Sequence, residues 1–226
     1  TGVQTCALPI LLDSTGHLWF TSDGSGVVEL KNPDAEPGQL DVTQYSGRVL
    51  SDRVFGGHVD RKGMLYFVAD INVKYYRKDS ARFDNLQLKG IPQYFATTCI
   101  LVDRRGNIWF GKHNGGLYRY DPERDTSQMY DLIKAGLSSN WVSTLFEDDE
   151  GNIWAGTWGG GIARVNADNR IELYNARNGL PGMKIWTIMQ DREENILIGT
   201  HENGLCVYKG DYFVSYFEED GLVNSQ

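Results

Sequence analysis

The chain has 226 residues, of which 41% are hydrophobic and 23% charged, which is enough for one large domain with a hydrophobic core. Its formal net charge of −8 argues against nucleic acid and against an anionic membrane surface as partners, because both would repel an acidic protein. No run of about 18 apolar residues is present, so we expect no segment that inserts into a membrane. The three cysteines, Cys6, Cys99 and Cys206, lack the spacing of a disulfide framework or of a zinc site.

Residues 1–9, TGVQTCALP, match no later part of the chain, and we interpret them as a non-native segment that takes no part in the fold. From residue 10 onward one pattern recurs about every 45 residues. Its most regular form is GNIWAGT at Gly151. The other copies are GHLWFTS at Gly16, GMLYFVA at Gly63, GNIWFGK at Gly106 and a less regular copy, ENILIGT, at Glu194.

Each repeat predicts four short antiparallel strands. In the fourth repeat, residues 141–148 alternate apolar and polar side chains, and turn residues separate them from further strand-like runs at 152–157, 161–166 and 170–176. Four strands at this period are typical of a β-propeller blade. The sequence therefore predicts an all-β fold with about five four-stranded blades. Their expected ranges are 10–46, 53–89, 94–132, 141–176 and 185–217, with the start of a further blade at 218–226, so we expect a fragment of a larger propeller.

The repeated glycines and tryptophans have structural explanations. Gly106 and Gly151 stand where a tight hairpin turn needs positive φ. The run WGGG at 158–161 resembles a phosphate loop, but a strand and not a helix follows it. The tryptophans at one strand position, Trp19, Trp109 and Trp154, are expected to pack between neighbouring blades.

Three stretches carry a family resemblance: DRRGNIWFGKHNGGLYRYD at 103–121, GLSSNWVSTLFEDDEGNIWAGTWGGGIARVN at 136–166 and GLPGMKIWTIMQDREENILIGTHENGLCVYKG at 179–210. The pattern resembles the two-component regulator propeller repeat. The resemblance implies the extracytoplasmic, periplasmic sensor part of a membrane-anchored bacterial regulator, such as a hybrid histidine kinase or a diguanylate cyclase. It also implies a small ligand, frequently a glycan, adjacent Ig-like, membrane and output domains, and a possible homodimer.

Two sets of positions are candidates for a ligand site, because propeller ligands usually lie where the inter-blade connections and the turns after the second strand share one face. The turn positions differ from blade to blade, as a specific pocket requires: they are Asp23, Asp70, His113, Trp158 and His201. The connections add Tyr94, Asn140, Trp141, Lys184 and Trp186. Aromatic rings beside polar donors suit a sugar ring. The alternative is that these are ordinary turn residues or ends of inner strands, with Trp141 and Trp186 in the core.

Catalytic and metal sites have weaker support in the sequence. His113 and His201 lack an indicated third metal ligand, and we expect neither a metal nor a cofactor. No carboxylate pair of a glycosidase and no GxSxG motif stands out, so we expect a binding module and not an enzyme. A propeller glycosidase or lyase and a protein–protein scaffold remain the alternatives.

Overall fold

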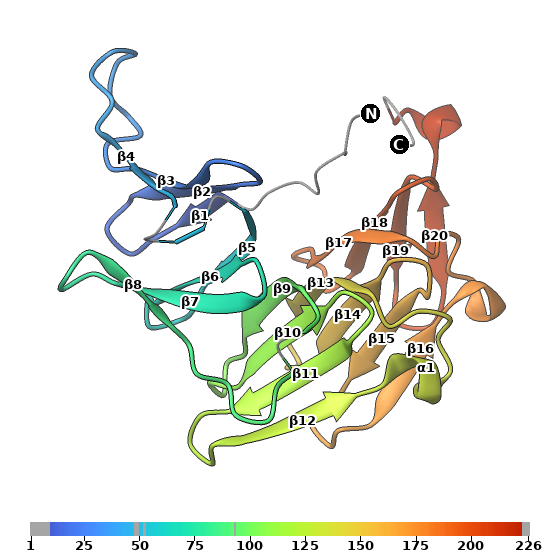
Figure 1. Ribbon diagram of the computed structural model, residues 1–226. Coiled ribbons are helices and arrows are strands. Elements are labelled where there is room, and N and C mark those ends of the chain that lie inside the picture. Colours follow the sequence, from blue (N-terminus) through green and yellow to red (C-terminus); the bar gives the residue numbers. More distant parts are fainter. Residues whose placement is uncertain (1–9, 48–49, 52, 93, 223–226) are drawn as a thin grey trace.

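The structure is a computed structural model that describes residues 10–47, 50–51, 53–92 and 94–222. The segment 1–9, interpreted as non-native, lies outside the described residues, as do residues 223–226 of the expected start of a further blade. The described residues form five four-stranded antiparallel sheets (Figure 1).

Every sheet holds four strands that are consecutive in the chain. The first sheet consists of β1 (Ile10–Leu12), β2 (Leu18–Ser22), β3 (Gly26–Leu30) and β4 (Val42–Tyr45). The second consists of β5 (Val54–Val59), β6 (Leu65–Ala69), β7 (Asn72–Arg77) and β8 (Arg82–Asn85). The third consists of β9 (Thr97–Val102), β10 (Ile108–Lys112), β11 (Gly116–Asp121) and β12 (Thr126–Tyr130). The fourth consists of β13 (Val142–Glu147), β14 (Ile153–Thr157), β15 (Ile162–Val165) and β16 (Ile171–Tyr174). The fifth consists of β17 (Ile185–Gln190), β18 (Ile196–Thr200), β19 (Leu205–Tyr208) and β20 (Phe213–Tyr216).

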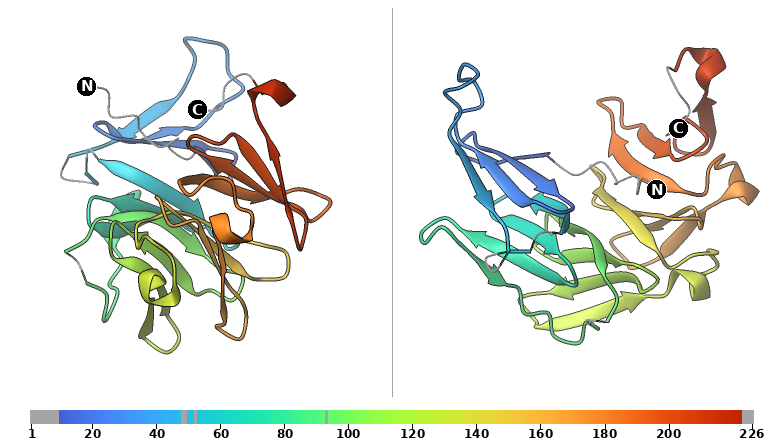
Figure 2. Two further views of the ribbon diagram at one scale, coloured as in Figure 1. Left: turned by 90° about the vertical axis from the view of Figure 1, so that its right-hand side faces the viewer. Right: turned by 45° about the horizontal axis from the view of Figure 1, so that its top comes forward.

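Successive sheets are arranged as propeller blades. The first strand of one blade packs beside the first strand of the next, β5 on β9, β9 on β13 and β13 on β17. The sheets follow one another around an arc that is open between the first and the fifth blade (Figure 2). These observations confirm the predicted all-β propeller architecture with five blades.

Short helical turns follow the fourth strand of the third, fourth and fifth blades. They are α1 (Leu132–Ala135), η1 (Ala176–Asn178) and η2 (Glu218–Asp220). Each precedes a Gly-Leu pair, and η2 lies in the segment expected to open a further blade. That further blade stays a prediction. None of the helices among the described residues has the length and apolar character needed to cross a membrane.

The hydrophobic core is divided into four layers, each between two successive blades. The repeated tryptophans lie in these layers: Trp19, Trp109 and Trp154 are almost fully buried, and Trp19 contacts Phe67 of the next blade with ring centroids 5.9 Å apart. A buried indole needs a partner for its N–H. The indole nitrogen of Trp154 donates to Asp148 at 2.7 Å, and the other two make the equivalent bond to the aspartate six residues earlier.

The turn between the first and second strands explains the glycine that recurs in the repeat pattern. Gly151 has φ of +83°, and its N–H donates to the carbonyl of Asp148 at 2.9 Å. A side chain is unfavourable in this left-handed region, which accounts for glycine there. Gly106 has the same conformation, with φ of +85°.

Candidate functional site

One backbone position is equivalent in every blade, namely the residue that directly follows the second strand. In the fourth blade, the N–H of Trp158 donates to the carbonyl of Trp141, the residue before the first strand, at 2.8 Å. In the fifth blade, the N–H of His201 donates to the carbonyl of Lys184 in the same way, at 3.0 Å. Because this bond recurs, the side chains of the residues that follow the second strands lie at the same end of the blades.

An aromatic row runs across the third, fourth and fifth blades on this end. We use this name for five residues: His113, Trp141, Trp158, Trp186 and His201. The ring centroids are 4.2 Å apart for His113 and Trp141, 5.6 Å for Trp141 and Trp158, and 5.0 Å for Trp158 and Trp186. His201 lies 5.0 Å from Trp158 and stacks on Trp186 at 5.6 Å with an interplanar angle of 28°.

The row is partly open to solvent. All five side chains are half-buried, and none belongs to the buried core clusters between the blades. The tryptophans of the row also differ from the core tryptophans in their backbone position, because none of them lies within a second strand. Trp141 and Trp158 flank strands, and Trp186 is the second residue of β17. A half-buried line of rings offers flat apolar surface to a ligand while its edges stay available for polar contacts.

Polar groups border the row at the fifth blade. The ammonium of Lys184 lies 5.8 Å from the centroid of the Trp158 ring and forms an ion pair with Glu202 at 2.7 Å. Nδ1 of His201 lies 3.3 Å from the same carboxylate. The hydrogen bond and charge of Lys184 lower the pKa of Glu202, so this carboxylate is ionised at neutral pH. Glu202 was not predicted as a site residue, and its place next to His201 in the turn is the only sequence signal for it.

Tyr94 and Asn140 were predicted as site residues but lie apart from the row. Tyr94 is 76% exposed, and its ring lies against that of Phe95 with centroids 4.7 Å apart. The side chain of Asn140 is turned onto the preceding connection, where its carbonyl oxygen accepts from the N–H groups of Leu132 and Ile133 at 2.8 and 3.1 Å. Its amide also donates to Asp131 at 2.9 Å, so Asn140 holds the first turn of α1 in place.

The two histidines of the row do not share a metal site. The indoles of Trp141 and Trp158 lie between them in the chain of ring contacts. Among the residues that the structure describes, no group of three or more His, Cys, Asp or Glu side chains is arranged to hold a metal ion.

The same end of the first two blades carries a charged pair at the described positions. Arg53, directly before β5, pairs with Asp23 of the first blade at 3.1 Å, and its guanidinium lies 5.1 Å from the ring of Phe55. The end of the propeller that carries the connections therefore has an aromatic part on blades three to five and a charged part on blades one and two.

Lys112 is a buried residue that the sequence reasoning missed. It stands where the fourth and fifth blades have Thr157 and Thr200, and it is only 2% exposed. Its ammonium donates to the carbonyl of Phe95 at 3.0 Å and lies 3.2 Å from the hydroxyl of Thr97. Burial lowers its pKa from 10.5 to about 8. The sequence signal for this residue was a lysine in place of threonine in an otherwise regular motif. The hydrogen bond of Lys112 to Phe95 links the connection that carries Tyr94 to the end of β10.

The repeat unit matches a known family model. The model described as two component regulator propeller matches residues 136–159 and 179–202. Two repeats of this chain thus match the two-component regulator propeller repeat. The matched stretches contain Trp141 and Trp158 in the first and Lys184, Trp186 and His201 in the second, so most of the aromatic row lies in the repeats that fit the family best.

Solved structures show where the same fold occurs. The extracellular domain of a protein described as the hybrid two component system BT3049 of B. thetaiotaomicron is 22% identical, with a TM-score of 0.76 over 99% of this chain and 30% of that one. The corresponding domain described for BT4673 of the same organism is 19% identical, with a TM-score of 0.76 over 92% of this chain and 30% of that one. The chain thus spans about 30% of the length of these domains.

An enzyme shares the fold as well. Virginiamycin B lyase from Staphylococcus aureus is 16% identical, with a TM-score of 0.72 over 94% of this chain and 71% of the lyase. No curated protein matches the sequence. At these identities the likeness to solved structures establishes the propeller fold, and the site has to be judged from its own residues.

Proposed function

We propose that this propeller is the ligand-binding sensor part of a bacterial signal-transduction protein, placed outside the cytoplasm, and that its aromatic row contacts the ligand. The observation that carries the proposal is the continuous half-buried row of three indoles and two imidazoles. The extracellular two-component domains of similar fold support the sensor role and the location.

The chemistry of the row favours a small ligand with apolar faces and polar edges, such as an oligosaccharide. Indole rings stack on the apolar face of a sugar ring, and the Lys184–Glu202 pair at the border offers a donor and an acceptor to hydroxyl groups. Binding would change how this face packs against an adjacent domain or a second copy, and this change would bias the output domain of the parent protein.

Calorimetric titration of the purified chain with a set of oligosaccharides, followed by chromatography of the recovered ligand, tests the proposal. Saturable binding that leaves the ligand intact, and that is weakened in Trp158→Ala, is the expected result. No saturable binding by the set, or binding unaffected in Trp158→Ala, would contradict it.

An enzymatic role is the second candidate, because a lyase shares the fold over 94% of this chain. The same chromatography separates the two functions. Ligand that is cleaved or rearranged in proportion to protein concentration would favour the enzyme.

A further inference from the structure

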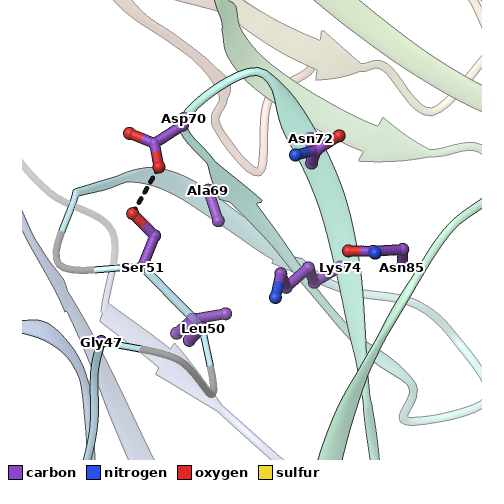
Figure 3. A pocket seen from close by; sticks show the side chains of 8 residues that line it. All are labelled: Gly47, Leu50, Ser51, Ala69, Asp70, Asn72, Lys74 and Asn85. Atoms are coloured by element: carbon purple, nitrogen blue, oxygen red, sulfur yellow. Dashed lines mark hydrogen bonds between the residues drawn. The ribbon is translucent and has the colours of Figure 1, made fainter.

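The second blade contains an open hollow of about 380 Å³ that is separate from the aromatic row. Polar side chains dominate its lining. Ser51 comes from the connection before β5, Asp70 from the turn after β6, Asn72 and Lys74 from β7, and Asn85 from β8. Figure 3 shows these side chains gathered around Leu50 and Ala69, with the Ser51 hydroxyl directed at Asp70.

The hollow exists because the turn of this blade is short. In the fourth blade β14 ends at Thr157 and β15 begins at Ile162, whereas in the second blade only Asp70 and Ile71 separate β6 from β7. The longer turn packs onto the connection before its blade: a Cβ added at Gly160 would lie 2.9 Å from the backbone nitrogen of Ser139.

The same turn position is filled in the third and fifth blades. A Cβ added at Gly115 would lie 3.0 Å from the ring of Phe95, and one added at Gly182 would lie 3.1 Å from Cβ of Asn203. Ser51 occupies the place in the second blade that Ser139 has in the fourth, three residues before the first strand. The turn of the second blade is too short to pack onto Ser51 in this way, and the hollow opens there.

The lining offers both signs of charge and two amides. The hydroxyl of Ser51 donates to Asp70 at 2.5 Å, which orients the carboxylate toward one side of the hollow. Asn72 and Lys74 are two residues apart on β7, so their side chains lie on one face of the strand. Asn85 is the backbone partner of Lys74 on β8. An anionic group can be recognised by an ammonium and amide N–H groups, and a cationic group by a carboxylate.

We propose that this hollow binds a small zwitterion of the size of a free amino acid. Lys74, with the amides of Asn72 and Asn85, receives the ligand carboxylate, and Asp70 receives its ammonium group. The volume is at the lower end of the range of roughly 300–1,000 Å³ that is usual for small-molecule sites, which suits one such molecule.

Calorimetric titration of the 226-residue chain with glycine, L-serine, L-leucine, L-phenylalanine and L-glutamate, each taken to millimolar concentration, tests this site. We expect saturable binding of at least one of these amino acids. In Asp70→Asn and in Lys74→Met the dissociation constant should rise about tenfold or more, because each loses a charge-assisted hydrogen bond. Asn tolerates the left-handed backbone of Asp70, whose φ is +53°, so Asp70→Asn should keep the fold even if Lys74→Met does not.

Three further variants make the test specific. Asp168→Asn removes an exposed carboxylate from another turn and should leave amino-acid binding unchanged, and so should Trp158→Ala. Insertion of two glycines between Asp70 and Ile71 restores a long turn and should abolish binding while thermal unfolding stays cooperative. Absence of saturable binding by all five amino acids would overturn the proposal. Binding that survives Asp70→Asn and the insertion unchanged would also overturn it.

Discussion

Trp158 and Trp186 come from successive blades, and their rings meet edge to face at 5.0 Å with an interplanar angle of 78°. Trp158 follows the second strand of the fourth blade and Trp186 lies at the start of the fifth. The contact therefore joins two repeats on the end of the propeller where connections and turns meet, outside the core that holds the blades together.

Replacing Trp158 by Ala should separate binding from stability. Because Trp158 is half-buried, its loss should cost the fold only about 1–2 kcal/mol through its aromatic contacts. Ligand affinity should fall roughly tenfold or more, as for an aromatic residue at the centre of a site. The matched control is Trp154→Ala in the same blade, where a 1% exposed ring is lost and the cost should be about 3–5 kcal/mol. Equal losses of stability in the two variants would place Trp158 in the core.

Replacing Trp154 by Phe should show how much the hydrogen bond from Trp154 to Asp148 contributes to the free energy of unfolding. The ring is largely kept, but a buried carboxylate oxygen loses the donor that now lies 2.7 Å away. The free energy of unfolding should fall by roughly 1–3 kcal/mol, measured by denaturant titration. The N–H groups of Asn152 continue to bond Asp148, so the hairpin itself should persist. A variant as stable as the parent would mean that the bond contributes nothing net.

Asn140→Ala tests whether this residue belongs to the connection or to the ligand site. The variant leaves the N–H groups of Leu132 and Ile133 without their side-chain acceptor. Stability should fall by about 1–2 kcal/mol, as for a lost helix cap. Affinity for the ligand should change less than about twofold, well below the effect of a contact residue. A large loss of ligand affinity at unchanged stability would mean that Asn140 contacts the ligand.

The titration of Lys112 should be visible in the pH dependence of the free energy of unfolding. Burial lowers its pKa from 10.5 to about 8 in the folded protein, so between these values the unfolded chain binds a proton that the folded chain does not. Stability must then rise with pH in that window. The free energy of unfolding, compared with that of Lys112→Met, should increase from about pH 8 to about pH 10.5 and level off beyond it. Parallel pH profiles for the two proteins would mean that Lys112 titrates normally.

The repeat made the architecture predictable, because Gly151 and Trp154 recur with their neighbours at a period that only a blade explains. Register alone also placed Trp158 and His201 together, since both follow a second strand. The side chain of Asn140 was not predictable in this way. It shares the register of a site residue, but its direction depends on the helical turn that it caps. The hollow beside Asp70 was not predicted, because it depends on the turn after β6 being shorter than the equivalent turns of the other blades.

The indole N–H signals of the six tryptophans in a ¹H–¹⁵N correlation spectrum give the most direct test of the ligand site. During titration with a bound oligosaccharide, the signals of Trp141, Trp158 and Trp186 should shift. Those of Trp19, Trp109 and Trp154, whose N–H groups bond buried aspartates, should stay in place. Shifts confined to the aspartate-bonded indoles, or no indole shift at saturation, would contradict a ligand site on the aromatic row.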